Sequence, residues 1–223
     1  MNIKENLIEI KNTFQNSDCL LVAVSKTKPI SLLQEAYDAG IRDFGENKVQ
    51  ELVEKQEQLP ADIRWHMIGH LQRNKVKYIA SFVHLIHGVD SFKLLKEINK
   101  QAKKVDRTIS CLIQMHIAEE DSKFGFDQQE LDEMLQSTEI HELSNVKIIG
   151  LMGMATFTDD ESQVRKEFRG LKHLFDKLKS QKLPDNFELK EISMGMSGDY
   201  LIAQEEGSTM VRIGSTIFGS RKS

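Results

Sequence analysis

The feature that most constrains the fold is a repeated alternation between short β-branched runs and longer segments with helical periodicity. Eight strand-like runs follow one another from Leu20 onward, and a helical pattern follows each of the first seven. The predicted strands span residues 20–24, 41–44, 64–68, 82–86, 109–115, 147–151, 189–192 and 210–213. Strands that alternate with helices pair in parallel through right-handed crossovers, which leaves an open doubly wound sheet or a closed (β/α)₈ barrel. The count of eight favours the barrel.

The length fits the same fold. Eight units in 223 residues average about 28 residues each, which suits a compact TIM barrel. There are three prolines and no low-complexity linker, so nothing marks a domain boundary. We therefore predict an α/β fold in which residues 1–223 form a single (β/α)₈ TIM-barrel domain, with the barrel itself at residues 20–219. Apolar residues at helical spacing predict an extra N-terminal helix within residues 1–16.

Composition excludes several classes of protein. Thirty Lys and Arg residues against 34 Asp and Glu residues give a net charge of −4, so a nucleic-acid partner is not expected. The longest apolar run, residues 20–24, is far shorter than the ~20 residues of a membrane span, and the first residues are too polar for a signal peptide. We therefore expect a cytoplasmic protein without membrane association. Cys19 and Cys111 lie in strand-like runs and are expected to be buried free thiols.

Functional residues of a TIM barrel follow the carboxyl ends of its strands. Small, hydroxyl-rich segments follow the last two predicted strands, at residues 193–199 and 213–215. Barrels often bind phosphate at this place through backbone N–H groups and a helix N-terminus. Alternatively, Ser197 only caps a helix near residues 200–204, and the glycines form tight turns.

Lys26 follows the first predicted strand. It shares a face of that strand with Val22 and Val24, so its amine is expected to point into the barrel mouth, beside the phosphate loops. A lysine in such surroundings can form a Schiff base with an aldehyde. The alternative is a solvated loop lysine, because Lys28 and Pro29 already belong to a turn.

Arg212 lies on a strand that otherwise has core composition, two residues before Gly214. A buried arginine needs a partner, and the ring nitrogen of pyridoxal phosphate is one for which proteins use Asp or Arg. An arginine donates and stays charged, so it would keep that nitrogen unprotonated and weaken the ring as an electron sink. The alternative is a structural ion pair with a nearby carboxylate such as Glu205 or Glu206.

Asn47 and His66 are weaker candidates. Asn47 and Gln50 have the spacing of a capping box, which needs no ligand. His66 lies either near a bound ring or in the core. His66 and His70 lack a cysteine or carboxylate to complete a metal set, so no metal site is predicted.

Five separated motifs occur along the chain: VSKTKP at residues 24–29, FGENKVQE at 44–51, WHMIGHLQRNK at 65–75, SMGMS at 193–197 and VRIGSTIFG at 211–219. Together they resemble the pyridoxal phosphate homeostasis protein family. The resemblance spans nearly the whole chain and implies a TIM barrel related to that of fold-type III alanine racemases.

The resemblance also implies a set of cofactor-binding residues. They are Lys26, Asn47, His66, Met194, Ser197, Arg212, Gly214 and Ser215. Lys26 would hold pyridoxal 5'-phosphate as an internal aldimine, and Arg212 would contact the ring nitrogen. Ser197 and the backbone of Gly214 and Ser215 would bind the phosphate. Two positions depart from the family: Lys48 replaces a frequent aromatic and Gly198 a frequent acidic residue. Both are expected at the rim, where they bear on ligand access or partner contacts.

The implied function is intracellular pyridoxal phosphate homeostasis by a cofactor-binding protein without catalysis. Fold-type III racemases add a C-terminal β-domain that brings a second base, whereas this chain ends four residues after Gly219. The expected partners are the small-molecule cofactor and, transiently, pyridoxal phosphate-dependent enzymes, and the protein is expected to be a monomer. The alternatives are a small fold-type III amino-acid racemase that uses Lys26 as its base, and a Schiff-base aldolase acting on a phosphorylated sugar, which would be colourless.

Overall fold

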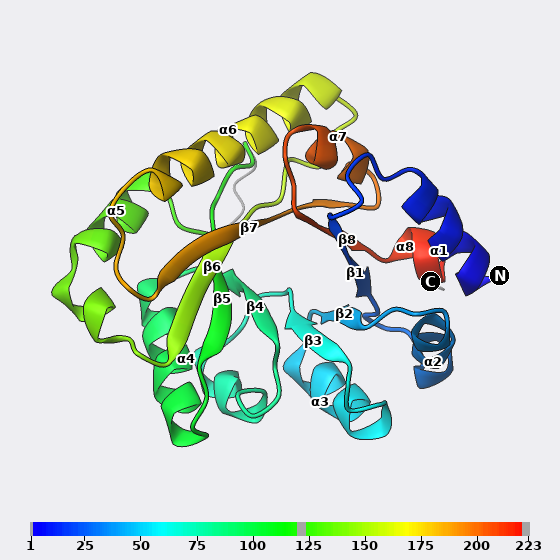
Figure 1. The fold of residues 1–223 in the computed structure, drawn as a ribbon, viewed down its shortest axis with the longest axis horizontal. Helices are drawn as coiled ribbons and strands as arrows, with labels where there is room; N and C mark the ends of the chain where they lie inside the picture. The colour runs from blue at the N-terminus through cyan, green and yellow to red at the C-terminus, as the bar shows by residue number, and fades with distance from the viewer. Residues whose placement is uncertain (1, 120–123, 220–223) are drawn as a thin grey trace.

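The computed structural model describes residues 2–119 and 124–219 and shows eight parallel strands that close into a barrel in chain order (Figure 1). The strands are β1 Leu20–Val24, β2 Asp43–Glu46, β3 Arg64–Met67, β4 Leu85–Val89, β5 Ile109–Gln114, β6 Val146–Met152, β7 Phe187–Met196 and β8 Met210–Ile213. β1 pairs with both β2 and β8, which closes the sheet. The predicted (β/α)₈ barrel is confirmed.

Helices surround the strands (Figure 1). They are α1 Ile3–Asn12, α2 Ile30–Asp38, α3 Val49–Gln58, α4 Phe92–Lys104, α5 Gln128–Gln136, α6 Glu161–Lys179, α7 Tyr200–Glu205 and α8 Ser215–Phe218, with 3₁₀ helices η1 Arg73–Tyr78 and η2 Thr138–Glu142. The N-terminal helix α1 packs against α2 and α8. The connection after β3 therefore contains only the short η1, whereas α-helices follow the other strands.

Some strand bounds differ from those that the apolar runs predict. β1 and β8 have the predicted bounds, whereas β4 lies three residues later and β7 extends at both ends. β4 contains His87 and Gly88, which interrupt the apolar pattern without interrupting the strand. A histidine fits inside a strand of a closed barrel when its ring nitrogens are hydrogen-bonded, as both are here.

The core has two layers that follow the period of two along each strand. An inner cluster fills the barrel and includes Val22 of β1, Leu85 of β4 and Met210 of β8. Their strand neighbours, such as Ala23 and Val211, face the helices in an outer cluster. Residues two positions after an inner residue therefore point into the barrel towards its mouth.

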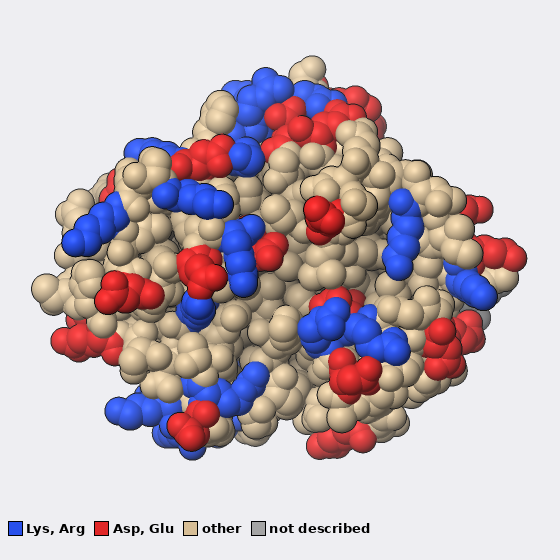
Figure 2. Space-filling view, viewed as in Figure 1, with Lys and Arg blue, Asp and Glu red and all other residues tan. Residues whose placement is uncertain are grey.

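Basic and acidic side chains are interspersed over the face shown in Figure 2. Within residues 2–119 and 124–219, no helix is long and apolar enough to cross a membrane. Cys19 and Cys111 are buried free thiols, as predicted. Burial raises the pKa of Cys19 to about 12 and also raises that of Cys111, so neither is an activated thiol.

Candidate functional site

The carboxyl ends of β1, β7 and β8 bring most of the predicted site together. Val22 lies opposite Arg212 in the β1–β8 ladder, so the segment with Lys26 and the end of β8 are neighbours. A Cβ atom on Gly214 would lie 2.9 Å from the carbonyl oxygen of Val24, so only glycine permits this approach of the two backbones. The N–H of Gly214 donates to Ser197 Oγ at 3.3 Å, which joins the loops after β7 and β8.

Ser215 begins α8 and is exposed. Backbone N–H groups in the first turn of a helix have no acceptor within the helix and can bind an anion. The two loops predicted to bind phosphate thus meet beside the segment that carries Lys26.

Lys26 lies in a tight turn after β1 and is half-buried. The N–H of Lys28 donates to the carbonyl of Ser25 at 3.0 Å and closes the turn. Thr27 has a φ of 65°, in the left-handed region that β-branched residues rarely adopt. Its N–H donates to Glu51 Oε1, a contact that holds the strained backbone in place.

The buried ammonium of Lys55 connects this turn to the barrel through hydrogen bonds. Lys55 Nζ donates to the carbonyl of Ser25 at 2.7 Å, to Glu46 Oε1 at 2.6 Å and to Glu51 Oε1 at 2.7 Å. Ser25 Oγ donates to the same oxygen of Glu46 at 2.6 Å. Burial raises the pKa of Glu46, although Lys55 and Ser25 oppose the shift. The turn therefore depends on a dry charged cluster that spans β1, β2 and α3.

Lys28 contacts a different part of the structure, the end of α8. Its ammonium donates to the carbonyls of Phe218 and Gly219, at 3.1 and 2.9 Å. These carbonyls end α8, where a cation is favourable. Of the two lysines in the motif, Lys28 thus secures the last helix, whereas Lys26 lies on the strained turn at the mouth.

Arg212 points into the barrel and is 3% exposed. Nη1 donates to Ser193 Oγ at 2.6 Å and Nη2 donates to the carbonyl of Gly153 at 3.2 Å. Burial lowers the pKa of Arg212 to about 10, against the opposing charge of Asp199, so the guanidinium is cationic at neutral pH. A guanidinium has five N–H donors, so these two bonds leave donors for a ligand.

The alternative partners of Arg212 are engaged elsewhere. Glu206 pairs with Arg165 and Arg169, and Glu205 pairs with Arg165. The interpretation of Arg212 as an ion-pair partner of these two glutamates is therefore wrong.

The other predicted residues occupy varied positions. Asn47 follows β2 and is half-buried; α3 is capped at Lys48 without a side-chain bond, so the capping box does not form. Met194 is fully buried in the outer cluster, so its side chain faces the helices. Gly198 and Lys48 are exposed at the rim, as expected. The roles of Asn47 and Met194 in binding a cofactor stay predictions.

His66 is buried inside the barrel on β3. Its Nδ1 lies 2.9 Å from His87 Nε2 and its Nε2 lies 3.0 Å from Asp43 Oδ1. Its contact with a cofactor stays a prediction, because His87 and Ser193 stand between it and Arg212.

His87 and Ser193 are interior polar residues that the sequence does not single out. His87 shares strand parity with the inner residue Leu85, and this parity would have indicated an inward histidine. The predicted fourth strand ends before His87, so that signal was lost.

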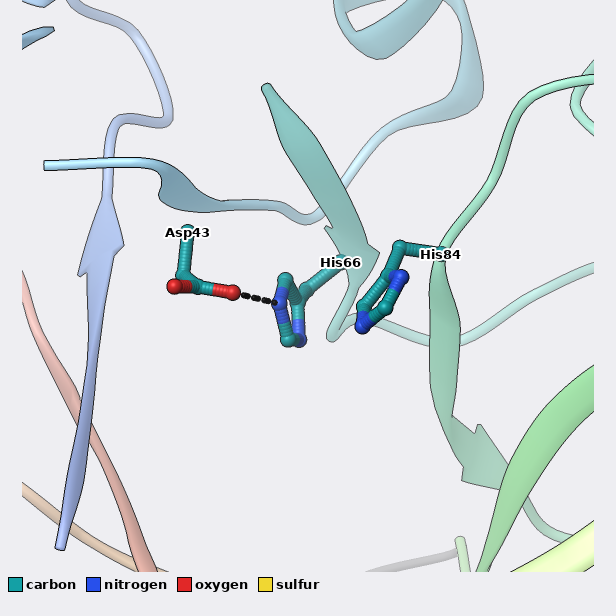
Figure 3. A group of neighbouring side chains, drawn as sticks. All are labelled: Asp43, His66 and His84. Carbon is teal, nitrogen blue, oxygen red and sulfur yellow. Dashed lines mark hydrogen bonds and ion pairs between the residues drawn. The ribbon is translucent and has the colours of Figure 1, made fainter. Parts of the chain in front are cut away.

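Asp43, His66 and His84 form the group with metal-binding geometry among residues 2–119 and 124–219, with ligand atoms within 4.8 Å of one another (Figure 3). The carboxylate of Asp43 already accepts from Arg64 Nε at 2.8 Å and lies 3.0 Å from His66 Nε2. The expectation of no metal site stays a prediction.

Comparison with known proteins gives a consistent result. Residues 1–222 match the family model described as alanine racemase, N-terminal domain. A pyridoxal phosphate homeostasis protein of Aquifex aeolicus is 42% identical over 203 residues, which cover 91% of this chain and 87% of that protein.

Comparison with solved structures is consistent with these matches. PipY of Synechococcus elongatus, solved with PLP bound, has 33% identity and a TM-score of 0.87 and covers 97% of this chain and 100% of its own. Alanine racemase of Clostridium difficile shares the fold at 16% identity and a TM-score of 0.77, with 56% of its own length covered. The chain belongs to the pyridoxal phosphate homeostasis protein family, within the larger family of the alanine racemase N-terminal domain.

Proposed function

We propose that this protein binds pyridoxal 5'-phosphate at the barrel mouth, as a Schiff base on Lys26, and serves intracellular pyridoxal phosphate homeostasis. The observation that carries the proposal is the meeting of three separate features at one end of β1, β7 and β8. They are the Lys26 turn, the inward guanidinium of Arg212, and the joined loops of Ser197 and Gly214. The structure of PipY with PLP bound, a relative at 33% identity, supports it.

The donors fit the three functional groups of the cofactor. The hydroxyl of Ser197 and the N–H groups of Gly214 and Ser215 suit a phosphate dianion at the start of α8. Arg212 stays cationic and can donate to a ring nitrogen. Lys26 has a primary amine, which condenses with an aldehyde and releases water.

We propose further that the protein does not catalyse amino-acid chemistry. A cationic Arg212 that donates to the ring nitrogen leaves that nitrogen unprotonated and limits the ring as an electron sink. The relatives named pyridoxal phosphate homeostasis protein support this proposal. The alternative is a small racemase, which the fold shared with alanine racemases favours.

The proposal includes a monomeric, cytoplasmic protein whose partner is the small-molecule cofactor. Transient contact with pyridoxal phosphate-dependent enzymes would pass the cofactor on. Sedimentation of the loaded protein, alone and mixed with such an apoenzyme, tests the monomer and the transient contact. A stable oligomer of the loaded protein alone would contradict this part.

A spectral titration tests the binding site. We expect pyridoxal phosphate to produce a visible Schiff-base band in the wild-type protein and no such band in Lys26→Ala. Pyridoxal, which lacks the phosphate, is expected to bind at least about tenfold more weakly, because charge-assisted bonds are stronger than neutral ones. Equal affinity for the two compounds would contradict the phosphate site at Ser197, Gly214 and Ser215.

A further inference from the structure

A continuous line of hydrogen-bonded side chains crosses the barrel interior below Arg212. Ser193 Oγ, the acceptor of Arg212 Nη1, lies 2.8 Å from His87 Nδ1. His87 Nε2 lies 2.9 Å from His66 Nδ1, and His66 Nε2 lies 3.0 Å from Asp43 Oδ1. Each of the five residues is 4% exposed or less. The line starts on β8 near the mouth and ends at the first residue of β2, at the base of the barrel.

The two ends of this line fix its direction. Arg212 can only donate, and an ionised Asp43 can only accept. Ser193 therefore accepts from Arg212 and donates to His87 Nδ1, His87 donates Nε2–H to His66 Nδ1, and His66 donates Nε2–H to Asp43. Both imidazoles are then neutral and carry the proton on Nε2.

The reverse direction is unfavourable. It would leave the hydroxyl proton of Ser193 without its acceptor on His87 and turn a lone pair of His66 towards the carboxylate of Asp43. A proton on both ring nitrogens of His66 would make its Nδ1 donate to His87 Nε2, which again places the proton of His87 on Nδ1 and leaves the hydroxyl proton of Ser193 without its acceptor.

We propose that Asp43 is a positioning residue for the cofactor site, although it lies at the opposite end of the barrel. Its carboxylate orders the tautomers of His66 and His87, and this order leaves His87 Nδ1 as the acceptor for the hydroxyl proton of Ser193, so that the lone pairs of Ser193 are directed towards Arg212. With Nη1 held by Ser193 and Nη2 by the carbonyl of Gly153, the guanidinium is fixed in one plane. The consequence for the cofactor rests on the proposed function, whereas the order of the tautomers does not.

Asp43 is buried but lies near the outer surface at the base of the barrel. Arg64, which holds the carboxylate, has a side chain that is 46% exposed. Both residues line a cleft at the base of the barrel. His84 lies beside His66, with ring centroids 5.4 Å apart, but is not part of the line, so His84→Gln is a matched control for Asp43→Asn (Figure 3).

The first test uses the protein without cofactor. In nitrogen-15 NMR spectra of labelled histidine, we expect His66 and His87 to be neutral Nε2–H tautomers at pH 7. Asp43→Asn is expected to change the tautomer of His66, because an amide can donate as well as accept. His84→Gln is expected to leave both rings unchanged. Nδ1–H tautomers, a cationic His66, or a spectrum that Asp43→Asn leaves unchanged would each overturn the proposal.

The second test measures the effect at the mouth with a matched pair of ligands. Pyridoxal phosphate is compared with its 1-deaza analogue, in which a carbon replaces the ring nitrogen that would accept from Arg212. Asp43→Asn is expected to weaken binding of pyridoxal phosphate about tenfold, the order of one charge-assisted hydrogen bond, and to leave the analogue within about twofold. His84→Gln is expected to change neither affinity.

Equal losses for the two ligands would mean that Asp43 has only a structural role, and would overturn the proposal. If Asp43→Asn does not fold, Ser193→Ala interrupts the same line and is expected to give the same selective loss, with equal losses again contradicting it. If the wild-type protein binds neither ligand, the proposed function fails while the tautomers still test the order of the line.

Discussion

Lys26 and Lys28 differ by two positions and have different surroundings. Lys28 donates to the last carbonyls of α8, whereas Lys26 lies on a strained turn fastened from below by Lys55. Strand parity with Val22 and Val24 pointed to Lys26 in the sequence, and the family resemblance then assigned its role. Parity could not reveal Lys55, because buried charges are rare and the contacts with Ser25 and Glu46 join different elements of the fold.

Asp43 is a buried carboxylate whose pKa is lowered. Burial alone would raise its pKa, but hydrogen bonds from His66 and Arg64 outweigh burial and lower the pKa from 3.8 to about 2. A lowered pKa adds stability above pH 3.8, and this stability is lost as the pH falls towards 2. The shift corresponds to about 2 kcal/mol at neutral pH and about half of that at pH 3.

We therefore expect the difference in unfolding free energy between wild type and Asp43→Asn to shrink by about 1 kcal/mol between pH 6 and pH 3. Urea unfolding at several pH values measures it. Asp62→Asn is the matched control, since Asp62 pairs with Arg42 on the surface and exposed pairs contribute little. A difference that stays constant with pH would mean that Asp43 does not titrate with a lowered pKa.

The segment that carries Lys26 draws its rigidity from α3. Lys55→Met removes the ammonium that contacts Ser25, Glu46 and Glu51, and leaves a buried carboxylate without its partner. We expect a loss of about 3 kcal/mol in unfolding free energy, together with weaker binding of pyridoxal phosphate. Lys48→Met, at the exposed N-cap of the same helix, is expected to change the unfolding free energy little. Equal effects of the two substitutions would contradict the role of Lys55.

The end of β7 offers a matched pair of glycines. Gly195 has a φ of 98°, and a Cβ there would lie 2.6 Å from Ala203 Cβ, whereas a Cβ on Gly198 would meet nothing within 4 Å. Gly195→Ala is expected to cost about 2 kcal/mol or more, from backbone strain and overpacking, and Gly198→Ala almost nothing. Thermal unfolding of the two variants measures the difference. A neutral Gly195→Ala would contradict the close contact between β7 and α7.

The predicted and observed bounds of the strands show which features of the fold the sequence encodes locally. β1 and β8 were predicted with their observed bounds because each is a short run of mainly apolar residues that ends at a turn. The position of β4 was wrong because His87 and Gly88 resemble a strand end, yet both are buried residues within the strand. The partners of His87 lie on β3 and β7, and no local pattern encodes contacts between such distant segments. The mouth was therefore predictable from topology, whereas the polar interior was not.

Closure of the barrel decides which residues can act together. It places β1 beside β8, so the first and last strands contribute Lys26 and Arg212 to the same mouth. The same fold occurs in alanine racemases, so the barrel by itself does not distinguish a carrier from an enzyme. The difference between a carrier and an enzyme must therefore lie in the residues at the mouth.

Loss of the α-proton from amino acids in deuterated solvent separates the two functions. With the loaded protein we expect exchange far below ~1 s⁻¹, the lower end of ordinary enzyme turnover, because in the proposed site Arg212 would leave the ring nitrogen unprotonated. Lys26→Ala is the control. Exchange at ~1 s⁻¹ or faster that disappears in this control would establish a racemase-like enzyme instead of a carrier.

The covalent attachment of the cofactor to Lys26 is tested by borohydride reduction of the loaded protein, followed by proteolysis and mass mapping of the peptides. We expect one pyridoxyl adduct, on Lys26, because its turn lies beside the end of β8 with Arg212 and the loops proposed to bind phosphate, whereas Lys28 is bound to the end of α8. The adduct should persist in Lys28→Ala and be absent in Lys26→Ala. An adduct on Lys28 or on any other lysine of the wild-type protein would contradict the assignment.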